Sequence, residues 1–162
     1  MKPESSALAS LSAVIGHDLE AIQRMDMELQ RLAPSLQAPD SDFRDLAAVG
    51  YTLHNLYNAM ENSFDQISRT FENHVVNEAQ WHKELLEKMF LEIPTVRPAL
   101  LTESLRKLLN DLRGFRHLFR HGYDFDLDVE RLRTLVARWN AEKSGLTNAL
   151  AAFRKGLLPP AE

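Results

Sequence analysis

Apolar residues recur along most of this 162-residue chain at three- and four-residue steps, the spacing of one helical face. The first such segment covers residues 5–32, with apolar positions at Leu8, Leu11, Ile15, Leu19, Ile22, Met25, Leu29 and Leu32. Pro34 and Pro39 follow it, and proline does not continue a helix. The pattern therefore predicts a first helix over residues 5–32 and a short connection.

The pattern is strongest in the second segment, where two interleaved seven-residue repeats predict a long helix buried in a bundle. One repeat comprises Leu46, Leu53, Met60 and Ile67, and the other comprises Gly50, Tyr57, Phe64 and Phe71. We interpret the aromatic residues as core packing rather than a cofactor pocket. Asp40 or Ser41 is the expected N-cap, and Asn73 lies near the expected end. His54 and His74 have no partner at ligand spacing, so we expect surface or hydrogen-bonded core positions for them.

Three further helices are predicted. Residues 78–91 form the third, which Pro94 and Pro98 terminate; its Trp81 is expected to pack, although His82 and Glu84 near a site are an alternative. The fourth runs from a cap at Thr102 to Gly122. The fifth begins at Asp126 or Asp128 and contains Ser144-Gly145, where it can bend. No strand, internal repeat or low-complexity segment is evident.

The fold class predicted from these elements is all-α, a mostly antiparallel bundle of about five helices. We expect one domain over residues 1–158 and a frayed tail over residues 159–162.

Hydrophobic content of 44% and charged content of 26% are typical of a globular protein. The chain has no cysteine, which excludes disulfides and thiolate sites. No apolar run approaches the roughly 18 residues of a membrane span, and the N-terminus lacks the order of a secretory signal, so we expect a cytoplasmic protein without membrane partners.

The chemistry is concentrated in residues 113–123, where three arginines, two histidines and a tyrosine occur without an acid. The net charge of −4 argues against a protein that coats nucleic acid over its whole surface, but it permits a local basic site. On a helical wheel the fourth helix has an apolar face made by Leu105, Leu108, Leu109, Leu112, Phe115 and Phe119. Arg116 lies in or at the border of that face. A guanidinium there is unfavourable unless a carboxylate, carbonyl or phosphate pairs with it.

Histidine beside arginine suits reactions at phosphate. Histidine exchanges protons near neutral pH, and a guanidinium stabilises charge that grows on phosphorus. RNA supplies its own nucleophile, the 2′-hydroxyl, so we expect neither a metal nor a cofactor. Arg116 and His121 are about 140° apart around the helix, with about 7.5 Å of rise between them. A two-fold dimer would bring both to one cleft, and Gly114 would let two helices approach closely.

Other interpretations stay open at this point. An Arg/His-rich helix is more often a solvated face or an interaction patch than a catalytic one. His117 and His121 have the i, i+4 spacing of a two-histidine metal site, for which Asp124 or Asp126 is the candidate third ligand. Tyr123 can also serve simply to cover the helix end.

The run Arg116-His117-Leu118-Phe119-Arg120-His121, followed by Tyr123, resembles the Arg-φ-x3-His motif of the HEPN superfamily and its Arg-x4–6-His-x-Tyr extension in HepT-like ribonuclease toxins. The phrases Trp81-His82-Lys83-Glu84-Leu85-Leu86 and Arg97-Pro98-Ala99-Leu100-Leu101 are similar to a HepT-like subgroup. The resemblance covers about residues 40–135, and it implies a HEPN-like helical bundle.

The resemblance also implies an activity, namely a metal-independent endoribonuclease that is the toxin of a type VII-like toxin–antitoxin pair. Arg116 would stabilise the phosphorane, His121 would transfer protons, and His117 would orient or assist. Arg113 and Arg120 are interpreted as charges that steer RNA. An MntA-type nucleotidyltransferase antitoxin would transfer AMP from ATP to Tyr123, which would block and repel RNA. The alternatives are a non-catalytic HEPN adaptor or substrate-binding partner of a nucleotidyltransferase, and a dedicated RNA-binding module.

Overall fold

The computed structural model describes residues 3–73, 80–122 and 126–160, and most of them are helical. The elements in chain order are α1 (Ser5–Leu32), a 3₁₀ turn η1 (Ala33–Gln37), α2 (Phe43–Glu72), α3 (Trp81–Met89), a 3₁₀ turn η2 (Glu103–Leu105), α4 (Arg106–His121) and α5 (Val129–Leu157). No strand occurs in the described residues, where the one isolated β-bridge pairs Ile93 with Arg97. The predicted all-α class is confirmed.

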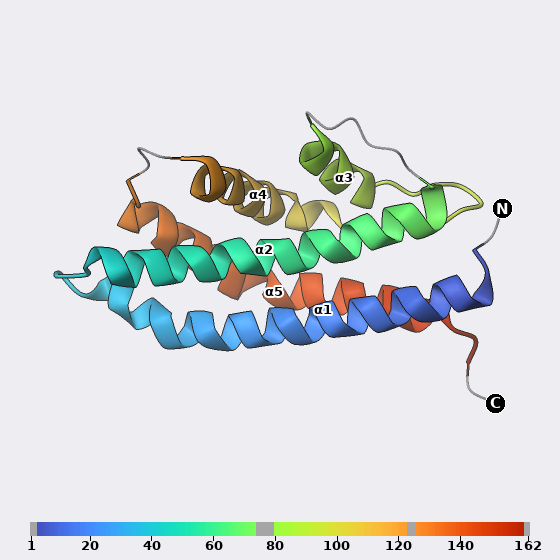
Figure 1. Cartoon of the computed structure of the whole chain (residues 1–162), viewed down its shortest axis with the longest axis horizontal. Coiled ribbons are helices and arrows are strands. Elements are labelled where there is room, and N and C mark those ends of the chain that lie inside the picture. The colour runs from blue at the N-terminus through green and yellow to red at the C-terminus, as the bar shows by residue number, and fades with distance from the viewer. Residues whose placement is uncertain (1–2, 74–79, 123–125, 161–162) are drawn as a thin grey trace.

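The three long helices α1, α2 and α5 lie along the length of the molecule, as Figure 1 shows. α1 runs antiparallel to both α2 and α5, so the start of α1 and the end of α5 lie at the same end of the bundle (Figure 1). α4 packs on α2 and α5, and the short α3 packs on α2 beside α4. None of the described helices is long and apolar enough to cross a membrane.

The core follows the predicted stripes. The seven-residue repeats of α2 place Leu53, Met60 and Ile67 on one seam and Tyr57 and Phe64 on the other, all with side chains fully inaccessible to solvent. They meet the apolar faces of α1, α4 and α5 in one continuous cluster of buried residues. Deleting a large side chain from such a core costs about 2–5 kcal/mol, because the cavity left behind fills only partly.

Three expectations about helix ends need correction. The N-cap of α2 is Asp42, whose Oδ1 accepts a hydrogen bond from the Asp45 N–H at 3.0 Å, and not Asp40 or Ser41. Thr102 precedes η2 rather than α4, and its hydroxyl pairs with that of Ser104 instead of capping a backbone N–H. Within the described residues the third helix spans Trp81–Met89, which is shorter than the predicted range of residues 78–91. By contrast, Asp128 caps α5, one of the two predicted choices.

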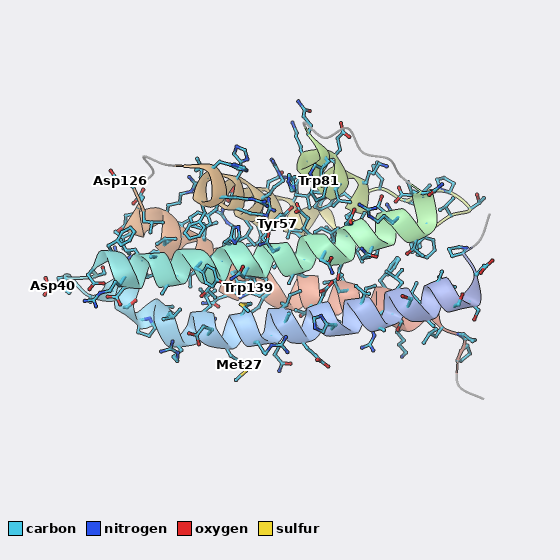
Figure 2. The ribbon with its side chains drawn as sticks, in the orientation of Figure 1. Met27, Asp40, Tyr57, Trp81, Asp126 and Trp139 are labelled. Carbon is cyan, nitrogen blue, oxygen red and sulfur yellow. The ribbon has the colours of Figure 1, made fainter. Side chains whose placement is uncertain are left out.

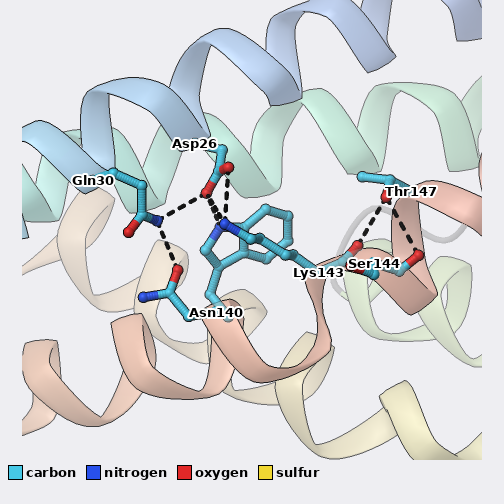
Figure 3. A network of polar contacts seen from close by, with 7 residues as sticks. Asp26, Gln30, Asn140, Lys143, Ser144 and Thr147 are labelled. Carbon is cyan, nitrogen blue, oxygen red and sulfur yellow. Dashed lines mark hydrogen bonds and ion pairs between the residues drawn. The ribbon is translucent and has the colours of Figure 1, made fainter.

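A polar network joins α1 to α5 at the middle of the bundle (Figure 3). Asp26 accepts hydrogen bonds from the Trp139 indole N–H at 2.8 Å and from the Lys143 ammonium at 3.0 Å. Burial opposes ionisation of Asp26, but these bonds and one from Gln30 outweigh it and lower the pKa of Asp26 below its ordinary value. The half-buried Asp26 carboxylate therefore fixes the register of α5 against α1 through its bonds to Trp139 and Lys143.

Arg97 fixes the connection between α3 and α4. Its side chain is fully buried, and it donates to the carbonyl oxygens of Lys88, Leu91 and Pro98 at 3.0–3.1 Å. Its charge is balanced by Glu72 near the end of α2, with 3.3 Å between Nη2 and Oε2. Arg97 therefore ties the connection that follows α3 to the end of α3 and to the end of α2.

Candidate functional site

Arg116 lies where the wheel predicts, at the border of the core. It is 7% exposed, although it is permanently charged. Its Nε donates to Asn58 Oδ1 on α2, and its Nη2 lies 3.8 Å from Oε1 of Glu61 on the same helix. A buried charge is stable only with such partners. Two side chains of α2 therefore hold the central arginine of α4 in place.

Glu61 also binds a histidine from a third helix. Its Oε2 lies 2.8 Å from Nδ1 of His82 near the start of α3, and the Glu61 carboxylate itself is only 4% exposed. Since an ionised carboxylate can only accept, the bond places the proton of His82 on Nδ1 and leaves Nε2 unprotonated in the neutral ring. The His82 ring stacks on Trp81 with 3.8 Å between centroids. Glu61 thus contacts Arg116 through Oε1 and His82 through Oε2.

These residues border a cleft of about 270 Å³ between α3 and α4. Its described lining comprises Gln80, His82, Lys83, Arg113, Arg116 and His117. Three basic side chains, Lys83, Arg113 and Arg116, line it, whereas Glu61, which does not line it, already pairs with Arg116 and His82. No carboxylate of the described residues pairs with Arg113, whose Nε is buried without a partner among them. The cleft is therefore suited to an anion such as a phosphodiester.

Tyr57 lies one helical turn before Glu61 and is fully buried. Burial first, and then the Glu61 charge, raise the pKa of the Tyr57 phenol, so its hydroxyl stays neutral. Tyr57 therefore belongs to the core and does not line the cleft. Figure 2 labels Tyr57 on α2 and Trp81 on α3, the two helices whose residues meet α4 here.

The structure divides the predicted site residues into two sets. Arg113, Arg116 and His117 border the cleft, whereas Arg120 and His121 are exposed and do not line it. The His117 and His121 rings lie 4.9 Å apart, so the histidine sector predicted from the wheel extends from the cleft to the surface. Tyr123, the proposed AMP acceptor, lies outside the described residues. A single chain thus brings together only part of the predicted set.

His54 of α2 is another histidine, besides His82 of α3, that the structure connects to this region. Its Nδ1 lies 3.3 Å from Asn58 Nδ2, and its ring lies 5.4 Å from that of Phe119 on α4. Burial lowers the pKa of His54, and the Arg116 and Arg120 charges lower it further, although a hydrogen bond with Asn55 opposes them. His54 therefore supports Asn58, and through it Arg116, as a neutral ring near pH 7.

The described residues contain no group of three His, Cys, Asp or Glu side chains placed to hold a metal ion. The rings of His117 and His121 lie 4.9 Å apart, but Asp126 does not join them in a group that could hold a metal ion. Asp124, the other residue considered as a third ligand, lies outside the described residues.

Sequence reasoning missed Asn58 and Glu61 and gave His82 only as an alternative. A signal for Glu61 was present, because it lies four residues after Tyr57 and three before Phe64, on the buried face of α2. A carboxylate on such a face needs a cation, and Arg116 is a cation on the apolar face of another helix. Glu84, considered together with His82, is exposed and does not line the cleft.

Comparison with known proteins gives one family. The family model described as HepT-like protein matches residues 48–157, which include most of α2 and all of α3, α4 and α5. No curated protein and no solved structure matches the chain. The matched range contains the cleft and every residue of the Arg/His segment, whereas α1 lies outside it.

Proposed function

Since the chain belongs to the HepT-like protein family, we propose that it is a metal-independent endoribonuclease, the toxin of a type VII-like toxin–antitoxin pair. The observation that carries this proposal is the buried guanidinium of Arg116 at a cleft lined by three basic side chains. Such a guanidinium is fixed in position before a substrate arrives, and preorganised charge is what stabilises a developing oxyanion most effectively.

The reaction is attack of an RNA 2′-oxygen on the adjacent phosphorus. Arg116 stabilises the negative charge on the pentacoordinate phosphorus, His121 transfers a proton, and His117, whose ring neighbours that of His121, orients or assists it. Arg113 and Arg120 attract and steer the RNA backbone, because charges near a site raise the local concentration of an oppositely charged substrate. No step in this scheme requires a metal ion.

The active form is a homodimer in this proposal. Arg116 borders the cleft, while His121 lies on the exposed side of α4, so a second copy is needed to bring both types of group to one phosphate. Space for that approach exists at Gly114, where an added Cβ would meet no atom within 4 Å. Sedimentation at micromolar concentration tests this point: a monomer that still cleaves RNA would refute the shared site.

Cleavage is tested with purified protein and labelled RNA in the presence of EDTA. His121→Ala should reduce cleavage by about 10²-fold or more, the usual contribution of a general acid or base. His17→Ala is the matched control, because His17 is also an exposed helical histidine but lies on α1. Products that end in a 2′,3′-cyclic phosphate support the scheme. An inactive wild-type protein that binds a partner through Arg113 and Arg120 would favour the adaptor function instead.

The toxin is neutralised by an MntA-type nucleotidyltransferase that transfers AMP from ATP to Tyr123. Tyr123 follows His121 by two residues, so an AMP group there would add bulk and negative charge next to the proton-transfer residue. Incubation with such an enzyme and ATP should raise the intact mass in AMP-sized steps and suppress cleavage. A mass increase that persists in Tyr123→Phe would refute the acceptor assignment.

A further inference from the structure

We propose that His82, held by the buried carboxylate of Glu61, is the general base of this cleft and acts on the RNA 2′-hydroxyl. The inference rests on the proposed ribonuclease function and deepens it by assigning a residue outside the Arg/His/Tyr motif. RNA transesterification needs two proton transfers, one from the 2′-hydroxyl and one to the departing 5′-oxygen. One histidine at the phosphate cannot readily perform both in a single step.

Three features of His82 suit the first transfer. The ring borders the cleft together with Arg113 and Arg116, so it lies on the same cavity as the charges that would hold the phosphate. Its Nδ1–H donates to Glu61 at 2.8 Å, which leaves Nε2 as the basic nitrogen. The imidazole side chain of His82 is 31% exposed, so it can reach a bound ligand. His82 thus combines access with a fixed orientation.

Glu61 acts as the positioning residue. A carboxylate behind an imidazole holds the ring in one tautomer and stabilises the imidazolium that forms when the ring accepts a proton. Glu61 is 4% exposed, so water screens this interaction only weakly. The same carboxylate lies 3.8 Å from Arg116 Nη2, which couples the position of the base to that of the phosphate-binding arginine.

The proton balance is complete without a co-reactant. Nε2 of neutral His82 takes the proton of the 2′-hydroxyl while the O2′–P bond forms. The P–O5′ bond breaks, and protonated His121, in the role proposed above, gives its proton to O5′. The products are a 2′,3′-cyclic phosphate and a 5′-hydroxyl. His82 then returns its proton to water, and His121 takes one from water.

A purely structural role is the competing interpretation, since the Glu61–His82 bond also ties α3 to α2. The two interpretations differ in what they require of the side chain. A structural tie needs only a hydrogen-bond donor at this position, which glutamine also provides. A general base needs a nitrogen that can accept and release a proton near neutral pH, which glutamine lacks.

The decisive experiment compares wild type, His82→Gln and His17→Ala in RNA cleavage with EDTA. His17 lies 3.9 Å from Asp18 on α1, so it is also a histidine near a carboxylate, but away from the cleft. We expect His82→Gln to lose about 10²-fold or more in kcat at unchanged Tm, and His17→Ala to match wild type. Binding of a 2′-O-methyl RNA, which cannot be cleaved, should stay within about twofold in all three, because Arg113 and Arg116 remain.

Two further readouts separate chemistry from structure. His82→Ala should regain activity when imidazole is added, because free imidazole can occupy the space and accept the proton. The pH–rate profile of wild type should rise with pH on its acidic side, and that rise should vanish in His82→Gln. The charged or titratable groups that face His82 are Glu61 from α2, Lys83 from α3, and Arg113, Arg116 and His117 from α4.

Each outcome decides between the proposals. An active wild type with an equally active His82→Gln overturns the role of His82 and leaves the ribonuclease function intact. A wild type that cleaves no RNA overturns both. Should His82→Gln lose its fold together with its activity, the imidazole experiment decides, and an unrescued His82→Ala overturns the inference.

Discussion

The Glu61–Arg116 pair predicts an unequal response to removing its two partners. In Glu61→Leu, Arg116 keeps its charge and its burial, and its remaining partner among the described residues is the neutral oxygen of Asn58. In Arg116→Leu, Glu61 still has His82 as a charged or neutral donor at 2.8 Å. Arginine cannot lose its proton to escape burial, whereas a carboxylate and an imidazole can share one. Glu61→Leu should therefore be the more harmful change.

The magnitudes follow from burial. Removing one partner of a buried ion pair costs about 3–5 kcal/mol, and we expect Glu61→Leu to fall in that range, because the Arg116 side chain is only 8% exposed. Arg116→Leu should cost about 1–3 kcal/mol, the penalty of a group that loses one of its hydrogen bonds. The double variant replaces the pair by two apolar side chains and should recover most of the loss.

Denaturant unfolding followed by circular dichroism measures these differences in unfolding free energy directly, and thermal unfolding followed in the same way gives Tm. For a chain of this length each kcal/mol corresponds to about 2–4 °C in Tm, so Glu61→Leu should lower Tm by roughly 6–20 °C. A variant Glu61→Leu as stable as wild type would refute the buried pair. Additive losses in the double variant would also refute it, because they would show no coupling between the two side chains.

Three other predictions test separate parts of the fold. Burial lowers the pKa of His54 from its ordinary value of 6.5, so the unfolded chain binds more protons than the native one as the pH falls through this region. The free energy of unfolding should therefore decrease between pH 7 and pH 5, and it should decrease less in His54→Gln. Urea titration at each pH measures both values. Gly50→Ala should cost about 1–3 kcal/mol of unfolding free energy, because the added Cβ would lie 2.9 Å from the Phe119 ring. In the control Gly16→Ala, the added Cβ would meet the flexible end of Arg154. Equal Tm values for the two variants would contradict the packing argument. Asp128→Ala should cost about 1 kcal/mol in thermal unfolding through loss of the α5 N-cap, and no change would show that the cap is dispensable.

Local rules account for much of the fold. α1 spans Ser5–Leu32, the predicted range, because its apolar steps continue until proline follows. α4 ends at His121 before Gly122, also as expected. The errors lie at ends where several polar residues compete: Asp40, Ser41 and Asp42 are all competent caps, and the packing of α2 selects the third.

The sequence by itself also located Arg116 at the border of an apolar face, because that position depends only on the period of one helix. It did not reveal that Asn58 and Glu61 hold the guanidinium, nor that His82 shares the carboxylate with it. Those contacts join residues 21 to 58 positions apart along the chain. Their existence depends on how α2, α3 and α4 are rotated against one another in the bundle. Helical periodicity is a property of each segment alone, whereas that rotation is set by the packing of all of them, so only the tertiary structure decides it.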